Sequence, residues 1–126
     1  MITGLVAYLL AQPSLTAITS QVAPVPLLET TPLPAITFQQ VSYTTGYSPQ
    51  PDGVSKSRMV FDCFGASYAD AANLAQAVKA VLSGYNGTLT DGTLVYLIEI
   101  VNVADAYVDH SRIYRTSVHA MVMYAE

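Results

Sequence analysis

The sequence predicts an α+β domain with a mainly antiparallel four-stranded sheet, helices on one face of it, and the element order α-β-β-α-β-β. Apolar residues recur at helical spacing over residues 67–84, and four other segments have the composition or alternation of strands. Glycine-bearing turn sequences separate these segments. A chain of 126 residues has the size of one domain, so residues 1–126 are expected to form a single folding unit.

The N-terminal third predicts a short helix followed by an extended connector. Ile2, Leu5 and Leu9 recur at helical spacing, and Pro13 stops or kinks the helix that they form. Residues 21–34 contain four prolines, which hold much of this segment extended. Because valine and leucine are interleaved with the prolines, we expect a connector that packs along the surface.

Residues 35–45, AITFQQVSYTT, are rich in β-branched and aromatic residues and predict the first strand. The following segment, GYSPQPDGVSKS at 46–57, predicts a long, polar, exposed loop because it is rich in glycine, proline and serine. Connections in compact domains usually take about 4–6 residues, so a loop of this length is expected to be either disordered or functional.

The stretch VFDCFGASYADAANLAQAVKAVLSG, residues 60–84, predicts a strand followed by a capped helix. The alternation over residues 58–63 places Met59 and Cys63 on one buried face of the strand. Ser67 and Asp70 have the spacing of a capping box at a helix start. One apolar stripe of the helix is expected to cover a face of the sheet: Ala71, Leu74, Ala75, Val78, Val81 and Leu82.

The C-terminal third predicts two further strands. Gly84 suits the position just past the helix end, and the Asn-Gly and Asp-Gly steps in 85–93 predict turns. Residues 94–101, LVYLIEIV, are apolar on both sides except for one glutamate, which is typical of a central strand. Residues 103–111 are expected to form a loop, and the alternating segment 112–126 predicts a long final strand.

The composition limits the classes of function. Hydrophobic residues make up 52% of the chain and charged residues only 11%, compared with about 25% for an ordinary soluble domain. This deficit suggests a surface that neighbouring molecules cover, although a monomer with an uncharged polar surface would have the same composition. With a net charge of −4 and five Lys or Arg residues, the chain is not expected to capture nucleic acid electrostatically.

The N-terminal apolar run lacks the basic residues of a signal peptide, and a membrane-spanning helix needs about 20 apolar residues, more than this run supplies. We therefore expect a protein of the cytoplasm that does not associate with membranes.

No catalytic, cofactor-binding or metal-binding residue stands out. His110 and His119 lie nine positions apart without the spacing of a metal site, so a structural or surface role is expected. Asp109 and Ser111 flank His110, but consecutive residues of an extended chain point to opposite sides and cannot align as a catalytic triad. Cys63 lies on the expected buried face, where cysteine acts as a small apolar residue.

Several segments together resemble the tail-completion proteins of long-tailed bacteriophages, which include tail terminators and tail-to-head joining proteins. The resemblance spans nearly the whole chain. It rests on the short N-terminal helix, the approach to the first strand in TPLPAITFQQVS, the strand-to-helix block in residues 60–84, the segment YNGTL after the helix, and the final strand ending in MVMYAE. These patterns are specific as a set and weak one by one.

The resemblance implies a structural protein of the virion and no enzyme. Members of this family assemble as a six-fold ring at the head-proximal end of the tail tube. The ring halts tube growth, presents a surface to the head connector or stopper protein, and leaves a lumen for DNA, which passes through without sequence-specific binding.

If the resemblance holds, the loop 46–57 is expected to make axial or lumen contacts. Its candidate side chains, with the arginine that follows it, are Tyr47, Asp52, Lys56 and Arg58. Arg112 and Arg115 are candidate partners for acidic groups of a neighbouring copy such as Asp62 or Glu99.

Other interpretations stay open at this point. The chain could be a small α+β ligand-binding or regulatory module that dimerises through sheet edges and binds its ligand between helix and sheet. An enzyme built on Asp109, His110 or Cys63 is a third possibility. A tail-tube subunit and a head-side stopper also remain within the phage interpretation.

Overall fold

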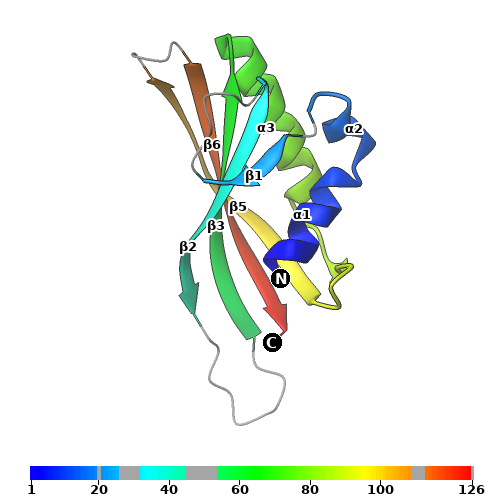
Figure 1. Ribbon diagram of the computed structural model, residues 1–126. Coiled ribbons are helices and arrows are strands. Elements are labelled where there is room, and N and C mark those ends of the chain that lie inside the picture. Colours follow the sequence, from blue (N-terminus) through cyan, green and yellow to red (C-terminus); the bar gives the residue numbers. More distant parts are fainter. Residues whose placement is uncertain (20, 26–31, 45–53, 109–112, 126) are drawn as a thin grey trace.

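The structure, a computed structural model, describes residues 1–19, 21–25, 32–44, 54–108 and 113–125. In chain order, its elements are α1 (Ile2–Leu10), α2 (Pro13–Thr16), β1 (Val22–Pro24), β2 (Ala35–Thr44), β3 (Val54–Gly65), α3 (Tyr68–Leu82), β4 (Gly87–Thr88), β5 (Leu94–Val108) and β6 (Ile113–Ala125). Figure 1 shows a twisted sheet with the helices gathered on one of its faces. The predicted α+β class is therefore confirmed.

The sheet has the strand order β1-β2-β3-β6-β5-β4, so β3 and β6 lie at its centre. β2, β3, β6 and β5 pair antiparallel in that order, whereas β1 runs parallel to β2. The prediction of a four-stranded sheet in the order α-β-β-α-β-β was wrong, because α2, β1 and β4 are additional elements. They contain four, three and two residues, and segments this short show no hydrophobic period.

Two strands extend into segments that were predicted as loops. β3 begins at Val54, inside the predicted loop 46–57, because Ser55 and Ser57 are fully buried and the strand pairs with β6 from its first residue. β5 continues to Val108, through most of the predicted loop 103–111. Residues 45–53 and 109–112 lie outside the described residues, so the loop prediction stays a prediction for them.

The apolar segment 94–101 was predicted as a central strand, but β5 lies one position from the end of the sheet. Its outer neighbour β4 pairs with it only at Gly87–Val95 and Thr88–Leu94. Most of β5 is therefore an edge strand, and the apolar residues on both of its sides need another explanation.

The core lies between the helices and one face of the sheet. α3 contributes Leu74 and Val78, which are fully buried together with Phe61 of β3 and Val118 of β6. Burial of each such side chain stabilises the fold by about 1.5–3 kcal/mol relative to exposure. Leu5 of α1 joins the same cluster, so α1 also covers this face.

The start of α3 is fixed by a capping contact and by a close approach to β3. The Ser67 hydroxyl accepts a hydrogen bond from the Asp70 backbone N–H at 3.2 Å, which is one of the two contacts of the predicted capping box. A Cβ atom added to Gly65 would lie 2.6 Å from the backbone nitrogen of Ala71, so only glycine fits where β3 passes the first turn of α3. At the other end of α3, Gly84 has a φ of 75°, as predicted.

We expect Gly65→Ala to lower the free energy of unfolding by about 1–3 kcal/mol, because the new methyl group would push α3 away from β3. Gly84→Ala is the matched control: its Cβ would meet nothing within 4 Å, so only the positive φ of Gly84 costs stability, about 1 kcal/mol. Urea unfolding followed by circular dichroism measures both. A Gly65→Ala loss no larger than that of Gly84→Ala would contradict the close-approach explanation.

Candidate functional site

No helix of the described residues covers the second face of the sheet, which we call the open face. On β3 it carries Lys56, Arg58 and Asp62, and on β6 it carries Arg115 and His119. These residues alternate with the buried positions of the same strands. The open face therefore gathers three of the chain's five Lys and Arg residues.

Two polar contacts link β3 and β6 on the open face. The Arg58 guanidinium lies 3.3 Å from Nδ1 of His119, and since a guanidinium only donates, this nitrogen is the acceptor. The Ser117 hydroxyl donates to a carboxylate oxygen of Asp62, a residue that is only 8% exposed. Asp62 thus has a partner within its own chain.

Lys56, Arg58 and Arg115, three of the six predicted site residues, share this open face. Lys56 and Arg58 lie in β3 and not in a loop, which corrects the prediction for these two residues. Tyr47, Asp52 and Arg112 lie outside the described residues.

The two arginines of the open face lack a full set of acceptors among the described residues. Among the described residues, no carboxylate lies within 4.0 Å of the guanidinium of Arg58 or Arg115. The Nε atom of each is buried without a hydrogen-bond partner. Ion pairing of Arg115 with Asp62 or Glu99 of a neighbouring copy stays a prediction.

Cys63 faces the core and is unsuited to catalysis. Its side chain is fully buried, and burial, with a further contribution from the charge of Asp62, raises the pKa of its thiol well above the ordinary value. The thiol therefore stays protonated, whereas a nucleophilic cysteine needs an accessible thiolate. His110 and Asp109, the other residues considered for catalysis, lie outside the described residues.

The outer edge of β5 is paired only at its beginning. Beyond the two β4 pairs, the Gly84 N–H donates to the carbonyl oxygen of Ile98 at 2.9 Å, and the Ile98 N–H donates to that of Tyr85 at 3.1 Å. From residue 99 to 108, no described strand lies beside β5 on this side. Val101 and Val103 are 42% and 43% exposed there.

The opposite edge of the sheet is also partly open. β1 pairs with residues 36–38 of β2, and a hydrogen bond from the Val25 N–H to the Phe38 carbonyl oxygen ends this contact. Residues 39–44 then have no described neighbour on that side, and Val41 and Tyr43 are 48% and 42% exposed. Sequence analysis missed both edges, although the apolar alternation through 101–108 was a signal that the strand continues.

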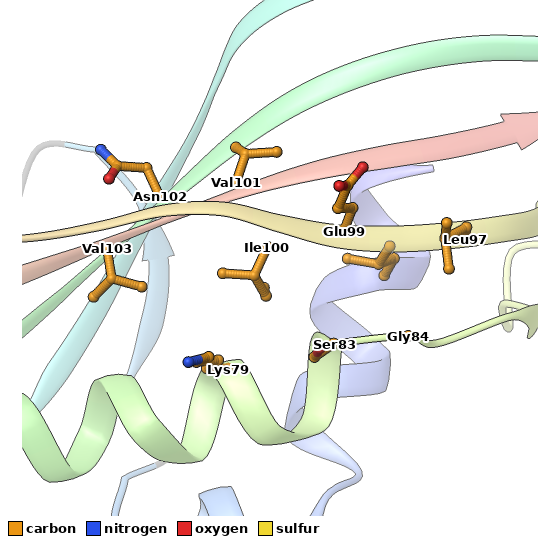
Figure 2. Close-up of a pocket in the computed structure, with 10 residues that line it drawn as sticks. Lys79, Ser83, Gly84, Leu97, Glu99, Ile100, Val101, Asn102 and Val103 are labelled. Atoms are coloured by element: carbon orange, nitrogen blue, oxygen red, sulfur yellow. The ribbon is translucent and has the colours of Figure 1, made fainter.

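An open groove of about 540 Å³ runs between the end of α3 and β5. Figure 2 shows Ile100 and Val103 on the side of β5 that faces Lys79 of α3, whereas Glu99 and Asn102 point away from it. The layer between α3 and the sheet, where a ligand-binding module would hold its ligand, is filled by the buried apolar side chains of the core. The groove therefore lies on the surface beside the open edge of β5, and it is not a pocket within the layer between α3 and the sheet.

Asp105 fastens the far part of β5 to neighbouring elements. One of its carboxylate oxygens accepts a hydrogen bond from the Tyr68 hydroxyl of α3, and the other accepts one from the Thr116 hydroxyl of β6, both at 3.0 Å. The hydrogen bond to Asp105 raises the pKa of the Tyr68 hydroxyl. The free edge is thus held in place although no strand lies beside it.

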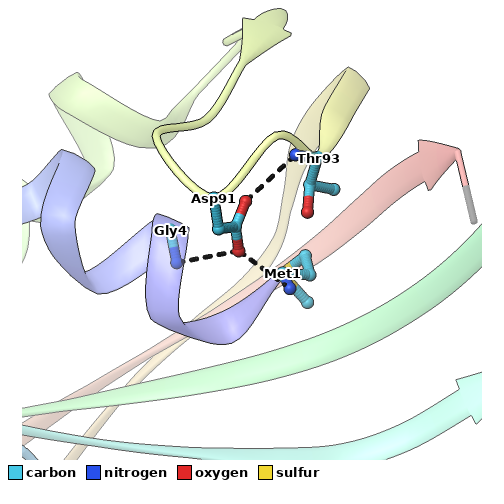
Figure 3. Close-up of polar contacts among 4 residues, drawn as sticks. All are labelled: Met1, Gly4, Asp91 and Thr93. Atoms are coloured by element: carbon cyan, nitrogen blue, oxygen red, sulfur yellow. Dashed lines mark hydrogen bonds and ion pairs between the residues drawn. The ribbon is translucent and has the colours of Figure 1, made fainter.

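Asp91 ties the turn after β4 to the first turn of α1 (Figure 3). One carboxylate oxygen accepts a hydrogen bond from the Gly4 backbone N–H at 3.1 Å and lies 3.0 Å from the Met1 ammonium group, and the other accepts from the Thr93 backbone N–H at 3.0 Å. Hydrogen bonds from Thr93, followed by those from Met1 and Gly4, hold the pKa of Asp91 well below its usual range. A Cβ atom on Gly4 would lie 2.6 Å from this carboxylate, which explains the glycine.

Other kinds of site have no support in the described part of the chain. No group of three or more His, Cys, Asp and Glu residues there could hold a metal ion. Within the same residues, every helix is too short or too polar to cross a bilayer.

Comparison with known proteins identifies a family and solved structures of similar fold. The family described as Tail completion protein gp17 matches residues 3–125. A chain of a solved structure titled "Virion of native gene transfer agent (GTA) particle" has the same fold, with a TM-score of 0.78 and 16% sequence identity over 95% of this chain and 90% of that chain. No curated protein matches the sequence.

We expect Asp91→Asn to lower the melting temperature near neutral pH, because a neutral amide accepts hydrogen bonds less strongly than a carboxylate. The pKa of Asp91 is lower in the folded than in the unfolded protein, so its stabilisation is complete above the ordinary value of 3.8 and is lost as the pH falls further. The difference between the two proteins should therefore shrink below that pH, as measured by thermal unfolding across a pH series. Glu99→Gln, at an exposed position of β5, is the control, and a difference that persists undiminished in acid would contradict the assignment.

Proposed function

Because the chain belongs to the family of Tail completion protein gp17, a family of structural proteins of the phage tail, we propose that it forms a ring at the head-proximal end of the tail tube. The ring is a hexamer of identical copies. It ends the growth of the tube and joins the tail to the head connector. The family match over residues 3–125 is the observation that carries this proposal.

The surface of the chain supports assembly. Charged residues make up 11% of the sequence, and the exposed large hydrophobic side chains include Val41 and Tyr43 of β2 and Val101 and Val103 of β5. These two groups lie toward opposite ends of the strand order, so each copy offers two different surfaces. Two different surfaces on one chain produce head-to-tail contacts, which close into a ring when the rotation between copies is right.

The partners follow from this position in the particle. The ring contacts the tail tube protein on one side and the head connector or stopper protein on the other. DNA passes through its lumen without sequence-specific binding, and the net charge of −4 opposes adhesion of the DNA. The protein resides in the virion after assembly in the host cytoplasm, and it has no membrane partner.

The open face is proposed to take part in the contacts of the ring. Arg58 and Arg115 are partly exposed and have no carboxylate within 4.0 Å among the described residues, and an acidic group of a neighbouring molecule would pair with the accessible side of each guanidinium. Tyr47, Asp52, Lys56 and Arg112 remain candidates for axial or inter-subunit contacts.

Native mass spectrometry of the purified protein over a concentration series tests the proposal. We expect monomers at low concentration and a hexamer that increases with concentration without larger species. A tail-tube subunit would instead give long polymers, and a ligand-binding module would give a stable dimer. Monomers at all concentrations that also fail to bind isolated tail tubes would refute the ring.

Arg115→Glu is expected to weaken the ring, raising its dissociation constant at least about tenfold because a paired charge at an interface is reversed. The monomer should stay folded, since Arg115 lies on the open face and outside the core. Gln76→Glu, which adds a negative charge at an exposed position of α3, is the matched control. An unchanged ring in native mass spectra of Arg115→Glu would exclude Arg115 from the contacts.

A further inference from the structure

The two open edges of the sheet fit each other. We infer that residues 102–107 of β5 pair with residues 39–44 of β2 from a second copy of the chain, so that the sheets of neighbouring copies join. This inference rests on the proposed ring and names the surfaces that hold it together.

Both edges have the features of strands that pair. Their outer N–H and C=O groups have no described strand beside them, and such rows of unpaired groups are templates for another strand. Proteins usually block this with charged residues or proline, yet residues 39–44, QQVSYT, contain neither. Residues 100–108 carry only Asp105, whose two oxygens already accept hydrogen bonds from Tyr68 and Thr116.

The strand directions make this contact antiparallel. β2 is antiparallel to β3, β3 to β6, and β6 to β5, so β2 and β5 run in opposite directions within one copy. Copies in a ring have the same orientation along the ring axis. β2 of one copy therefore approaches β5 of the next in the opposite direction, which continues the alternation of the sheet.

The faces of the two strands select a register. Tyr43 pairs with Ser57 on the face that the helices cover, and Val103 pairs with Val118 on the same face. Placing Tyr43 of one copy opposite Val103 of the next therefore keeps both on that face. In the same register, Ser42 of one copy lies opposite Ala104 of the next, and both of these side chains are on the open face. The contact covers two half-exposed apolar side chains at its centre.

The same register predicts a stagger between copies. Within one copy, Val103 pairs with Val118, Val118 with Phe61, and Phe61 with Phe38, so Val103 and Phe38 lie at the same height in the sheet. Tyr43 pairs with Ser57, which lies four residues from Phe61 along β3. Four residues correspond to a shift of about 13 Å over about 19 Å of sheet, the width of four strands. The strands then tilt by about 35° to the ring axis, which agrees with the tilt of about 35–45° that closed sheets require.

Cysteine crosslinking tests this register. One preparation carries Tyr43→Cys and a second carries Val103→Cys, and the native Cys63 stays in both because it is fully buried. After mixing under ring-forming conditions and oxidation, we expect a disulfide-linked dimer in the mixture, at a yield several-fold above that of either preparation alone. Ser42→Cys mixed with Ala104→Cys tests the neighbouring pair of the same register, because the Cα distance alternates between successive cross-strand pairs and both distances lie in the range of disulfides.

Tyr43→Cys mixed with Thr90→Cys is the control, because Thr90 is exposed but lies in the turn after β4 and outside the proposed contact. Crosslinking of Val103→Cys with itself would mean that two β5 edges pair symmetrically, which overturns the inference. A hexamer in native mass spectra without crosslinking of either pair would also overturn it while leaving the proposed ring intact. Absence of both hexamer and crosslink, in a protein that also fails to bind isolated tail tubes, would refute the ring together with this contact.

Discussion

The antiparallel ladder between β3 and β6 is the constraint on which the rest of the structure depends. It runs without interruption from Val54 paired with Ala125 to Gly65 paired with Tyr114. Because side chains alternate along both strands, this single register decides which residues face the helices and which form the open face. A shift of β3 by one residue against β6 would bring Arg58 into the core and expose Phe61. The positions of β2 and β5, and therefore of both open edges, follow from the same ladder.

The helices stabilise only one side of this sheet. α3 is capped by Ser67, lies close to Gly65 and covers the centre of the sheet. α1 covers a further part of the same face with Leu5, and Asp91 accepts a hydrogen bond from the first turn of α1. Neither the open face nor the outer part of β5 has an equivalent cover among the described residues. A domain of this size could have used a further helix or charged side chains to protect these surfaces. Their exposure makes sense for a protein that completes its structure in an assembly.

Sequence reasoning succeeded where a local signal was strong. Ser67, Gly84 and the apolar stripe predicted α3 because capping, positive φ and helical spacing are properties of the chain itself. It failed at Ser55 and Ser57, because serine is typical of turns and its burial in β3 depends on β6, a distant partner. It also assigned 94–101 to the centre of the sheet, since apolar residues on both sides of a strand show that the strand is covered but not by which molecule. The open face was not predicted, because Arg58 and Arg115 were named as separate contact residues and only the pairing of β3 with β6 places them on one face. The pairing of the edges depends on strand order, which no local pattern encodes.

The central claim is that the free edges of β2 and β5 are completed by other copies of the chain. Hydrogen–deuterium exchange of backbone amides, compared between the dilute protein and the protein at concentrations where it assembles, tests this most directly. The account predicts that exchange slows in residues 39–44 and 102–107 on assembly, while the amides of β3 and β6 stay protected in both states. Equal and rapid exchange of both edges in the assembled protein would contradict it.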